Sequence, residues 1–157
     1  RDDEHKYFGD INDDMIYLTD RWDEILIEAI ERRGRGWGIA YPACNNTPED
    51  VPLGEIISKK TIDALGYYYP PALNHLFIDW SHRDLFKPME LLFLCSNVAI
   101  EHRHFHWGLA PDDDNYSELY EVVNLQREEK LFRDWKIDQL PKDRERLENA
   151  LSNSQGV

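Results

Sequence analysis

The stretch that decides the fold is residues 88–108, which read PMELLFLCSNVAIEHRHFHWG. Its apolar residues recur at the three- and four-residue spacing of one helix face, between Pro88 and Gly108. The residues on this stripe are Leu91, Leu94, Cys95, Val98, His102 and Phe105. The spacing predicts a helix over 88–105. If the segment is extended instead, alternation puts Val98, Ile100, His102, His104 and His106 on one side.

Similar periodicity on both sides of this stretch predicts further helices. Thr19 is a suitable N-cap for the first of these helices, and Gly34 is a suitable residue for its C-terminal end. Residues 34–50, GRGWGIAYPACNNTPED, are rich in Gly, Pro and Asn and predict a loop. The predicted helical ranges are 19–33, 52–65, 71–83, 116–135 and 141–151.

These patterns predict an all-α fold, in which a single compact bundle of five or six helices carries an acidic N-terminal arm. The arm covers residues 1–18, the single helical domain covers 19–151, and a flexible tail covers 152–157. A chain of 157 residues with 41% hydrophobic residues is of the size and composition of one domain.

The formal net charge of −13 bears on partners more than on fold. Its acidic field would repel a phosphate backbone, so we expect no nucleic-acid binding. The same field would attract a protein partner with a basic surface. No apolar run reaches the roughly 18 residues of a membrane span, so no transmembrane segment is expected. The chain begins at Arg1, which allows a removed targeting segment and leaves its localisation unknown.

The histidine-rich end of this stretch is the main candidate for metal chemistry. Glu101 and His104 have the E-x-x-H spacing of carboxylate-bridged di-iron proteins, but the chain has no second E-x-x-H. In an extended segment, alternating histidines can bind one zinc ion. At a helix C-terminus, the histidines would interact with the helix dipole and need no metal. The candidate ligands are His102, His104, His106 and Glu101, with zinc or iron as the ion and no cofactor otherwise predicted.

His104–Gly108, HFHWG, resembles the zinc-binding strand of the alpha-class carbonic anhydrases. The resemblance implies a zinc ion bound by two alternating histidines within a large β-sheet. It covers five residues of 157, and Tyr120 stands where that family would need its third histidine. We therefore do not extend the resemblance to the rest of the chain.

Other residues carry weaker signals. His75, Asp79 and His82 form an i, i+4, i+7 row that suits acid–base or metal chemistry, or packing at a helix edge. Cys95 lies in an apolar run and is expected to be a buried, inert thiol, and Cys44 lies in a loop. Aromatic residues favour interfaces, so the candidate protein-binding residues are Tyr67, Tyr68, Tyr69 and Trp37.

Two functions follow from these observations. The first is a non-catalytic acidic protein-binding domain, such as an inhibitor or immunity-type protein or an accessory subunit of a larger complex. The alternative is a metal-dependent enzyme or metal-binding protein that uses the cluster of His102, His104 and His106. The sequence leaves open whether the protein is an enzyme.

Overall fold

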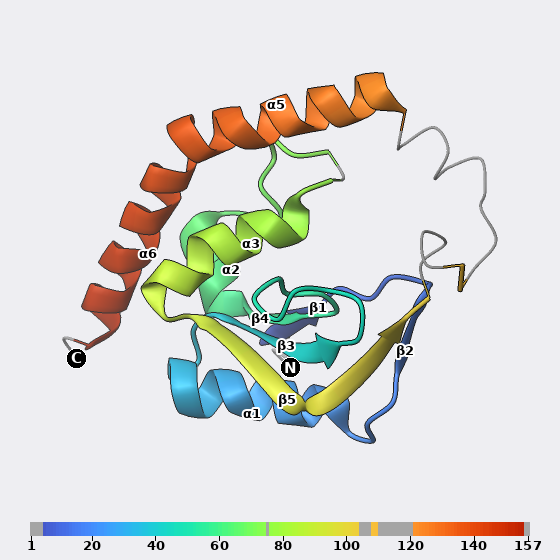
Figure 1. Ribbon diagram of the computed structural model, residues 1–157. Coiled ribbons are helices and arrows are strands. Elements are labelled where there is room, and N and C mark those ends of the chain that lie inside the picture. Colours follow the sequence, from blue (N-terminus) through green and yellow to red (C-terminus); the bar gives the residue numbers. More distant parts are fainter. Residues whose placement is uncertain (1–4, 75, 104–107, 110–120, 156–157) are drawn as a thin grey trace.

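The chain folds around a five-stranded mixed sheet with the strand order β1-β4-β3-β5-β2 (Figure 1). The computed structural model describes residues 5–74, 76–103, 108–109 and 121–155. The strands are β1 (Tyr7–Gly9), β2 (Met15–Tyr17), β3 (Ile39–Cys44), β4 (Ile56–Ser58) and β5 (Leu92–His102). β3 and β5 run parallel, and the other neighbouring strands run antiparallel. The expectation of an all-α bundle is therefore wrong.

Helices cover both sides of this sheet. In Figure 1, α1 lies on one side, α2 and α3 lie on the other, and α5 and α6 pack outside α2 and α3. The helices are α1 (Trp22–Gly34), α2 (Lys59–Leu65), α3 (Ile78–Phe86), α5 (Val122–Asp138) and α6 (Leu140–Gln155), and a short 3-10 turn spans Lys87–Met89. The predicted helices at 19–33 and 141–151 are confirmed, and the one at 116–135 is confirmed from Val122 onward as α5. The predicted helix at 71–83 is α3 only from Ile78 onward. The predicted helix at 52–65 is half right, because β4 occupies part of it.

The segment predicted as the helix 88–105 is the long strand β5. In Figure 1, β5 bends sharply near its middle, and the pairing with β3 shows why. Cys95 pairs with Pro42, whereas the next residue of β3, Ala43, pairs with Ala99. The residues of β5 between these two pairs form a bulge, which bends the strand.

The bulge explains why a strand shows helical periodicity. Buried residues alternate on each side of it, first Phe93 and Cys95, then Val98, Ile100 and His102. Because the bulge shifts the alternation by one position, residues 91, 95, 98 and 102 follow both the buried face of the strand and the i, i+4, i+7 spacing of a helix. The sequence pattern alone fits both structures over those positions.

The predicted N-terminal arm is also wrong, because residues 7–17 supply both edge strands of the sheet. β1 pairs with β4 at one edge, and β2 pairs with β5 at the other edge. Strands of three residues are too short to show a period in the sequence. The predicted loop at 34–50 likewise contains β3, whose residues Ile39 and Ala40 are fully buried at the centre of the sheet.

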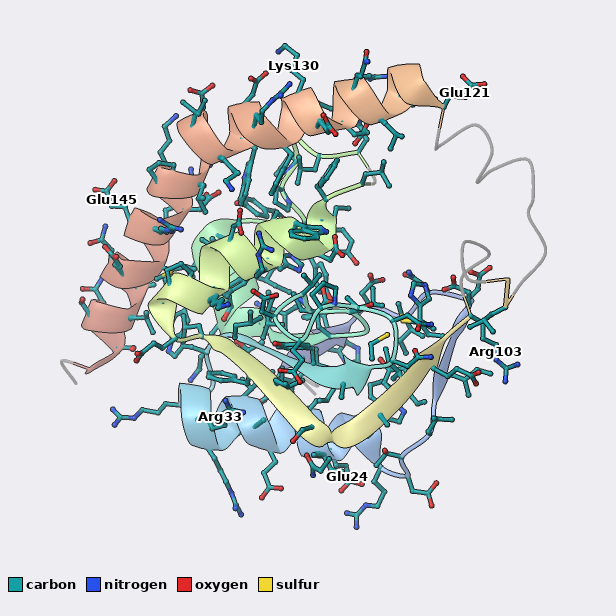
Figure 2. The ribbon with its side chains drawn as sticks, viewed as in Figure 1. Glu24, Arg33, Arg103, Glu121, Lys130 and Glu145 are labelled. Carbon is teal, nitrogen blue, oxygen red and sulfur yellow. The ribbon has the colours of Figure 1, made fainter. Side chains whose placement is uncertain are left out.

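The hydrophobic core lies between the sheet and α1 on one side, and α2, α3, α5 and α6 on the other. Charged side chains such as Glu24, Lys130 and Glu145 point away from it into solvent (Figure 2). Of the helices that the structure describes, none is both long enough and apolar enough to cross a bilayer.

Candidate functional site

Three side chains meet where the parallel strands β3 and β5 end, and we call them the histidine edge: Asp14, Cys44 and His102. Cys44 is the last residue of β3 and His102 is the last residue of β5. Asp14 directly precedes β2, whose first residue pairs with His102. The carboxyl ends of parallel strands are the usual location of ligand sites in open α/β sheets.

The carboxylate of Asp14 fixes the imidazole of His102. Its Oδ2 lies 3.0 Å from Nε2, and the backbone N–H of Arg103 donates to the carbonyl of Asp14 at 2.8 Å. Both side chains are largely shielded from solvent, with 9% of His102 and 12% of Asp14 exposed. The separation suits a hydrogen bond, and it also suits two neighbouring ligands of one ion. Two atoms that each lie about 2.1 Å from a metal at an angle of 90–110° are about 3.0–3.4 Å apart.

Cys44 contacts the same imidazole. Partial burial by itself raises the pKa of the Cys44 thiol, but hydrogen bonds with His102 and Thr47 outweigh it and bring that pKa below its ordinary value. The hydroxyl of Thr47 donates to Sγ at 3.4 Å. Burial lowers the pKa of His102, whereas its hydrogen bond with Cys44 and the charge of Asp14 raise it to a net value above the usual one. The two shifts together favour a thiolate beside an imidazolium.

The remaining metal candidates from the sequence do not join His102 within the described chain. Strand alternation puts Glu101 on the opposite side of β5 from His102, where it pairs with Arg103 at 3.0 Å. His104 and His106 lie outside the described residues. In the described ranges no group of three or more His, Cys, Asp or Glu side chains is arranged to hold an ion. For an ion at the histidine edge, the described residues would offer two ligands, Asp14 and His102.

A second group of polar side chains, which we call the acid–base cluster, lies around the start of α3. It comprises Asp10, Glu55, Tyr69, Asp79 and His82. His82 and Glu55 are at its buried centre, with 2% and 5% of their side chains exposed. Tyr69 stacks on the His82 ring with centroids 5.8 Å apart. Two members of the row predicted from the sequence, Asp79 and His82, thus belong to this cluster. The third member, His75, lies outside the described residues.

Both ring nitrogens of His82 lie within hydrogen-bonding distance of an oxygen atom. Nδ1 lies 3.0 Å from the carboxylate of Glu55, and Nε2 lies 3.1 Å from the backbone carbonyl of Tyr68. A carbonyl only accepts, and an ionised carboxylate only accepts, so this geometry favours the imidazolium form. Burial lowers the pKa of His82, but the hydrogen bond and charge of Glu55 raise it to a net value above the usual one. The geometry and the pKa direction together favour a buried ion pair between His82 and Glu55.

Asp79 is less completely buried than Glu55 and His82. Its side chain is only partly covered, and its Oδ1 accepts the backbone N–H of Trp80 at 2.9 Å. Desolvation raises the pKa of the Asp79 carboxyl to about 6, with the Trp80 hydrogen bond acting against it and the charge of Glu55 adding to it. A carboxyl with a pKa near neutrality suits proton transfer.

One short acidic segment, residues 10–14, connects the two groups. The hydroxyl of Tyr69 hydrogen-bonds to Asp10, and the backbone N–H of Asp10 donates to the carbonyl of Glu55 at 3.1 Å. Four residues later, Asp14 contacts His102. Four residues of extended chain span at most about 14 Å, so the backbones of Asp10 and Asp14 lie within that distance. Residues 10–14 therefore join the two groups through the backbone.

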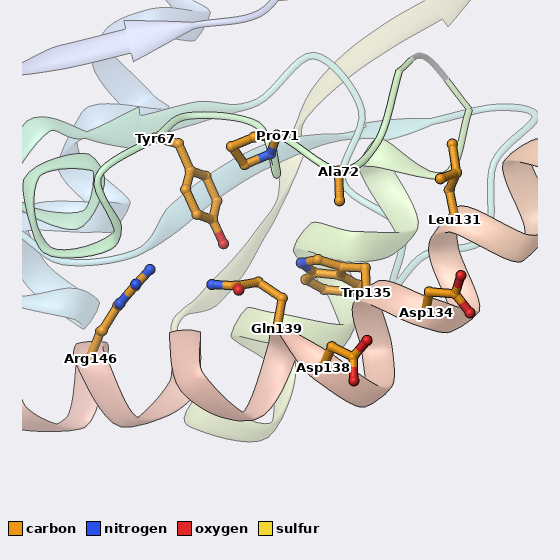
Figure 3. Close-up of a pocket in the computed structure, with 9 residues that line it drawn as sticks. All are labelled: Tyr67, Pro71, Ala72, Leu131, Asp134, Trp135, Asp138, Gln139 and Arg146. Atoms are coloured by element: carbon orange, nitrogen blue, oxygen red, sulfur yellow. The ribbon is translucent and has the colours of Figure 1, made fainter.

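The predicted protein-binding residues are buried or partly buried in the structure. Trp37 is buried in the core at 8% exposure, and the three tyrosines are partly buried. Tyr67 hydrogen-bonds to Asp143 and lines a pocket of about 410 Å³ (Figure 3). The pocket lies between α5, α6 and the segment after α2, and its walls include none of the residues of the histidine edge. The binding role stays an untested prediction.

Sequence reasoning missed Asp14, Cys44 and Glu55. Asp14 and Cys44 have no spacing relationship with His102, and only the strand pairing brings them together. Glu55 did carry a signal, because it is an acid inside the apolar run VPLGEII at 51–57. A charged residue in such a run is a candidate for burial with a partner.

Comparison with known proteins assigns no function to this arrangement of residues. A scan against protein-family models gave no match, and searches of curated proteins and of solved structures gave none either. The functional argument therefore depends on the site itself.

Proposed function

We propose that the protein is a metal-dependent enzyme that binds its ion between Asp14 and His102. The observation that carries the proposal is the 3.0 Å separation of Oδ2 and Nε2 in a shielded position at the carboxyl ends of β3 and β5. A carboxylate oxygen and an imidazole nitrogen together suit Zn²⁺, Fe²⁺ or Mn²⁺. His104 and His106 are the sequence's candidates for further ligands, two and four residues beyond His102.

The ion would polarise a substrate oxygen or a water molecule. It would also place positive charge in a chain whose net charge is −13, so that an anionic substrate group could approach. The protein's own residues would orient the ion and exclude water from the buried side of the site. Asn45 helps to hold His102 in place, because its side-chain Oδ1 accepts a hydrogen bond from the backbone N–H of His102 at 3.3 Å.

Metal titration of the purified chain tests the proposal. Calorimetry with Zn²⁺, Fe²⁺ and Mn²⁺, supported by elemental analysis, should show one ion per chain. Asp14→Asn and His102→Gln should each weaken binding at least about tenfold, since each removes one ligand. Asp20→Asn is the matched control, because it removes the same charge from an exposed position. Equal affinity in Asp14→Asn and Asp20→Asn would refute the proposal.

One observation favours a second candidate, a thiol-dependent enzyme. Cys44, His102 and Asp14 are connected in the order nucleophile, base and orienting carboxylate. In that function Cys44 would attack an electrophilic carbon of the substrate, and His102 would accept the thiol proton. The two candidates assign different roles to Asp14, as a metal ligand in the first and as an orienting group in the second.

Alkylation with iodoacetamide separates the candidates. At pH 7 the Cys44 sulfur should displace iodide faster than Cys95, which is buried and has a raised pKa because of that burial. Cys95 is therefore an internal control in the same chain. His102→Gln should slow alkylation of Cys44 and leave that of Cys95 unchanged. If His102→Gln has no effect on Cys44, the thiol-dependent function is excluded and the metal-dependent one is unaffected.

A further inference from the structure

The pocket between α5, α6 and the segment after α2 has the size of a small-molecule site, at about 410 Å³ (Figure 3). Its inner wall includes Trp135, which belongs to the hydrophobic core and is 2% exposed. The ring of Phe132 stacks on Trp135 with centroids 5.9 Å apart. Pro71, Ala72 and Leu131 add further apolar surface to the lining. A molecule in the pocket would therefore contact a largely apolar surface that the core holds in place.

Hydrogen bonds to one buried carboxylate fix the polar side of the pocket. That carboxylate is Asp143, which is completely buried. The hydroxyl of Tyr67 donates to its Oδ2, while Gln139 and Arg146 donate to its Oδ1 at 2.9 and 3.1 Å. Arg146 also donates to the backbone carbonyl of Leu65 at 3.3 Å. Because these three lining side chains are held before anything binds, a ligand would lose little affinity to ordering them.

The charges that line the pocket do not cancel. Arg146 is matched by Asp143, and Asp134 is matched by Lys130, whose Nζ lies 2.5 Å from the carboxylate. Asp138 lies one helical turn beyond Asp134 on α5 and is exposed to solvent. Among the described residues, no basic side chain forms an ion pair with Asp138. The lining therefore has one unmatched negative charge at its edge, which would attract a cation and repel an anion.

We propose that this pocket binds a small organic cation, an amine whose apolar body lies over Trp135 and whose ammonium group pairs with Asp138. The apolar lining favours a ligand with a hydrocarbon body over an inorganic cation. The unmatched carboxylate favours an amine over a neutral or acidic molecule of the same shape. The inference is independent of the proposed metal site, because none of the pocket's walls belongs to the histidine edge.

Titration of the full chain with phenethylamine tests the proposal. Nitrogen-15 NMR follows the indole N–H signal of Trp135, which is assigned through its bonds and checked by its loss in Trp135→Phe. The amine should shift this signal along a saturable curve. Phenethyl alcohol has the same body without the charge and should bind about threefold to fivefold more weakly, as expected for the loss of one solvent-exposed ion pair. Phenylpropionate, which is negatively charged, should bind more weakly than the alcohol.

Two variants locate the bound amine. Asp138→Asn should remove the preference for phenethylamine over phenethyl alcohol. Asp20→Asn is the matched control, because it removes the same charge from an exposed position outside the pocket, and it should keep the preference. Ala72→Phe adds a ring at an exposed position of the lining and should weaken both ligands, with thermal unfolding as the check that the variant folds.

Four outcomes would overturn the proposal. They are equal affinities for amine and alcohol in the wild type, amine binding that leaves the Trp135 signal in place, a shift that never saturates, and a preference that survives in Asp138→Asn. None of these outcomes bears on the metal site, because the titration contains no metal and uses no variant of Asp14 or His102. A saturable, amine-selective shift that depends on Asp138 and not on Asp20 supports the proposal.

Discussion

At the scale of single residues, two groups respond to folding in opposite ways. Folding disfavours the charged form of Asp79 and favours the charged form of His82. Desolvation is the main cause that raises the pKa of Asp79. Its ionised form is therefore less stable in the folded chain than in the unfolded chain. His82 is the opposite case, because Glu55 and the Tyr68 carbonyl stabilise its charged form inside the protein. An acid that lowers stability at neutral pH is typical of a functional group.

Replacing Asp79 should stabilise the protein at neutral pH. Asp79→Asn keeps an oxygen for the Trp80 N–H and removes the disfavoured charge. A rise of about two pKa units corresponds to about 1–3 kcal/mol, so the free energy of unfolding at pH 7 should increase by that amount. Urea unfolding measures it. Below about pH 3 the wild-type carboxyl is protonated in both the folded and the unfolded state, so the difference should vanish. A gain that persists there would point to another cause.

The His82–Glu55 pair should make stability fall as pH rises. The folded pKa of His82 is raised, so its contribution is fully present below the unfolded value of about 6.5 and is lost as pH rises through the folded pKa. Unfolding free energies measured from pH 6 to 9 should show this loss in the wild type and not in His82→Gln. His5→Gln, at an exposed position, should behave as the wild type does.

At the scale of elements, β5 determines the architecture. It pairs with β3 on one side and with β2 on the other, and it carries His102 at its end. Its first half packs on α1, where the guanidinium of Arg33 lies 4.8 Å from the centre of the Phe93 ring. Gly34 completes this contact, because a Cβ there would lie 2.7 Å from the ring of Phe93.

Truncating neighbouring residues of β5 distinguishes the strand from the predicted helix. Phe93 is 4% exposed and Leu94 is only partly buried, whereas a helical stripe would bury Leu94 and not Phe93. Phe93→Ala should therefore cost about 3–5 kcal/mol of unfolding free energy, and Leu94→Ala roughly 1 kcal/mol. Denaturant unfolding gives both values, and a larger cost at Leu94 would contradict the strand.

Sequence patterns predicted the elements whose apolar face is regular. α1 and α6 have uninterrupted helical spacing, and both were predicted. α1 nevertheless starts at Trp22 rather than after Thr19, whose hydroxyl instead accepts the backbone N–H of Ala99 in β5. β3 and the edge strands were missed because they are short, and β5 because its bulge imitates a helix.

At the scale of the whole molecule, the N-terminal segment encloses the sheet and completes the site. Residues 7–17 form both edge strands, and the loop between them carries Asp10 and Asp14. Asp14 and His102 are 88 residues apart in the chain, so an ion between them would link distant segments. On the other side, Asp143 of α6 is completely buried and accepts hydrogen bonds from Tyr67, from Gln139 and, within the same helix, from Arg146.

Metal should therefore stabilise the complete fold rather than one loop. With the free ion at one hundred times its dissociation constant, the unfolding free energy should rise by about 2.7 kcal/mol. Thermal unfolding with and without Zn²⁺ measures the shift. Asp14→Asn should remove it and Asp20→Asn should keep it. An equal shift in both variants would mean that the ion binds elsewhere.

The sequence by itself determined the size, the charge of −13, three of the helices and the chemical interest of His102, Asp79 and His82. These features depend on composition and on contacts between near neighbours in the chain. Only the tertiary structure decided that 92–102 is a strand and that Asp14, Cys44 and Glu55 belong to the site. The reason is physical: strand pairing and the bulge join residues far apart in the chain, and no local spacing encodes which segments pair.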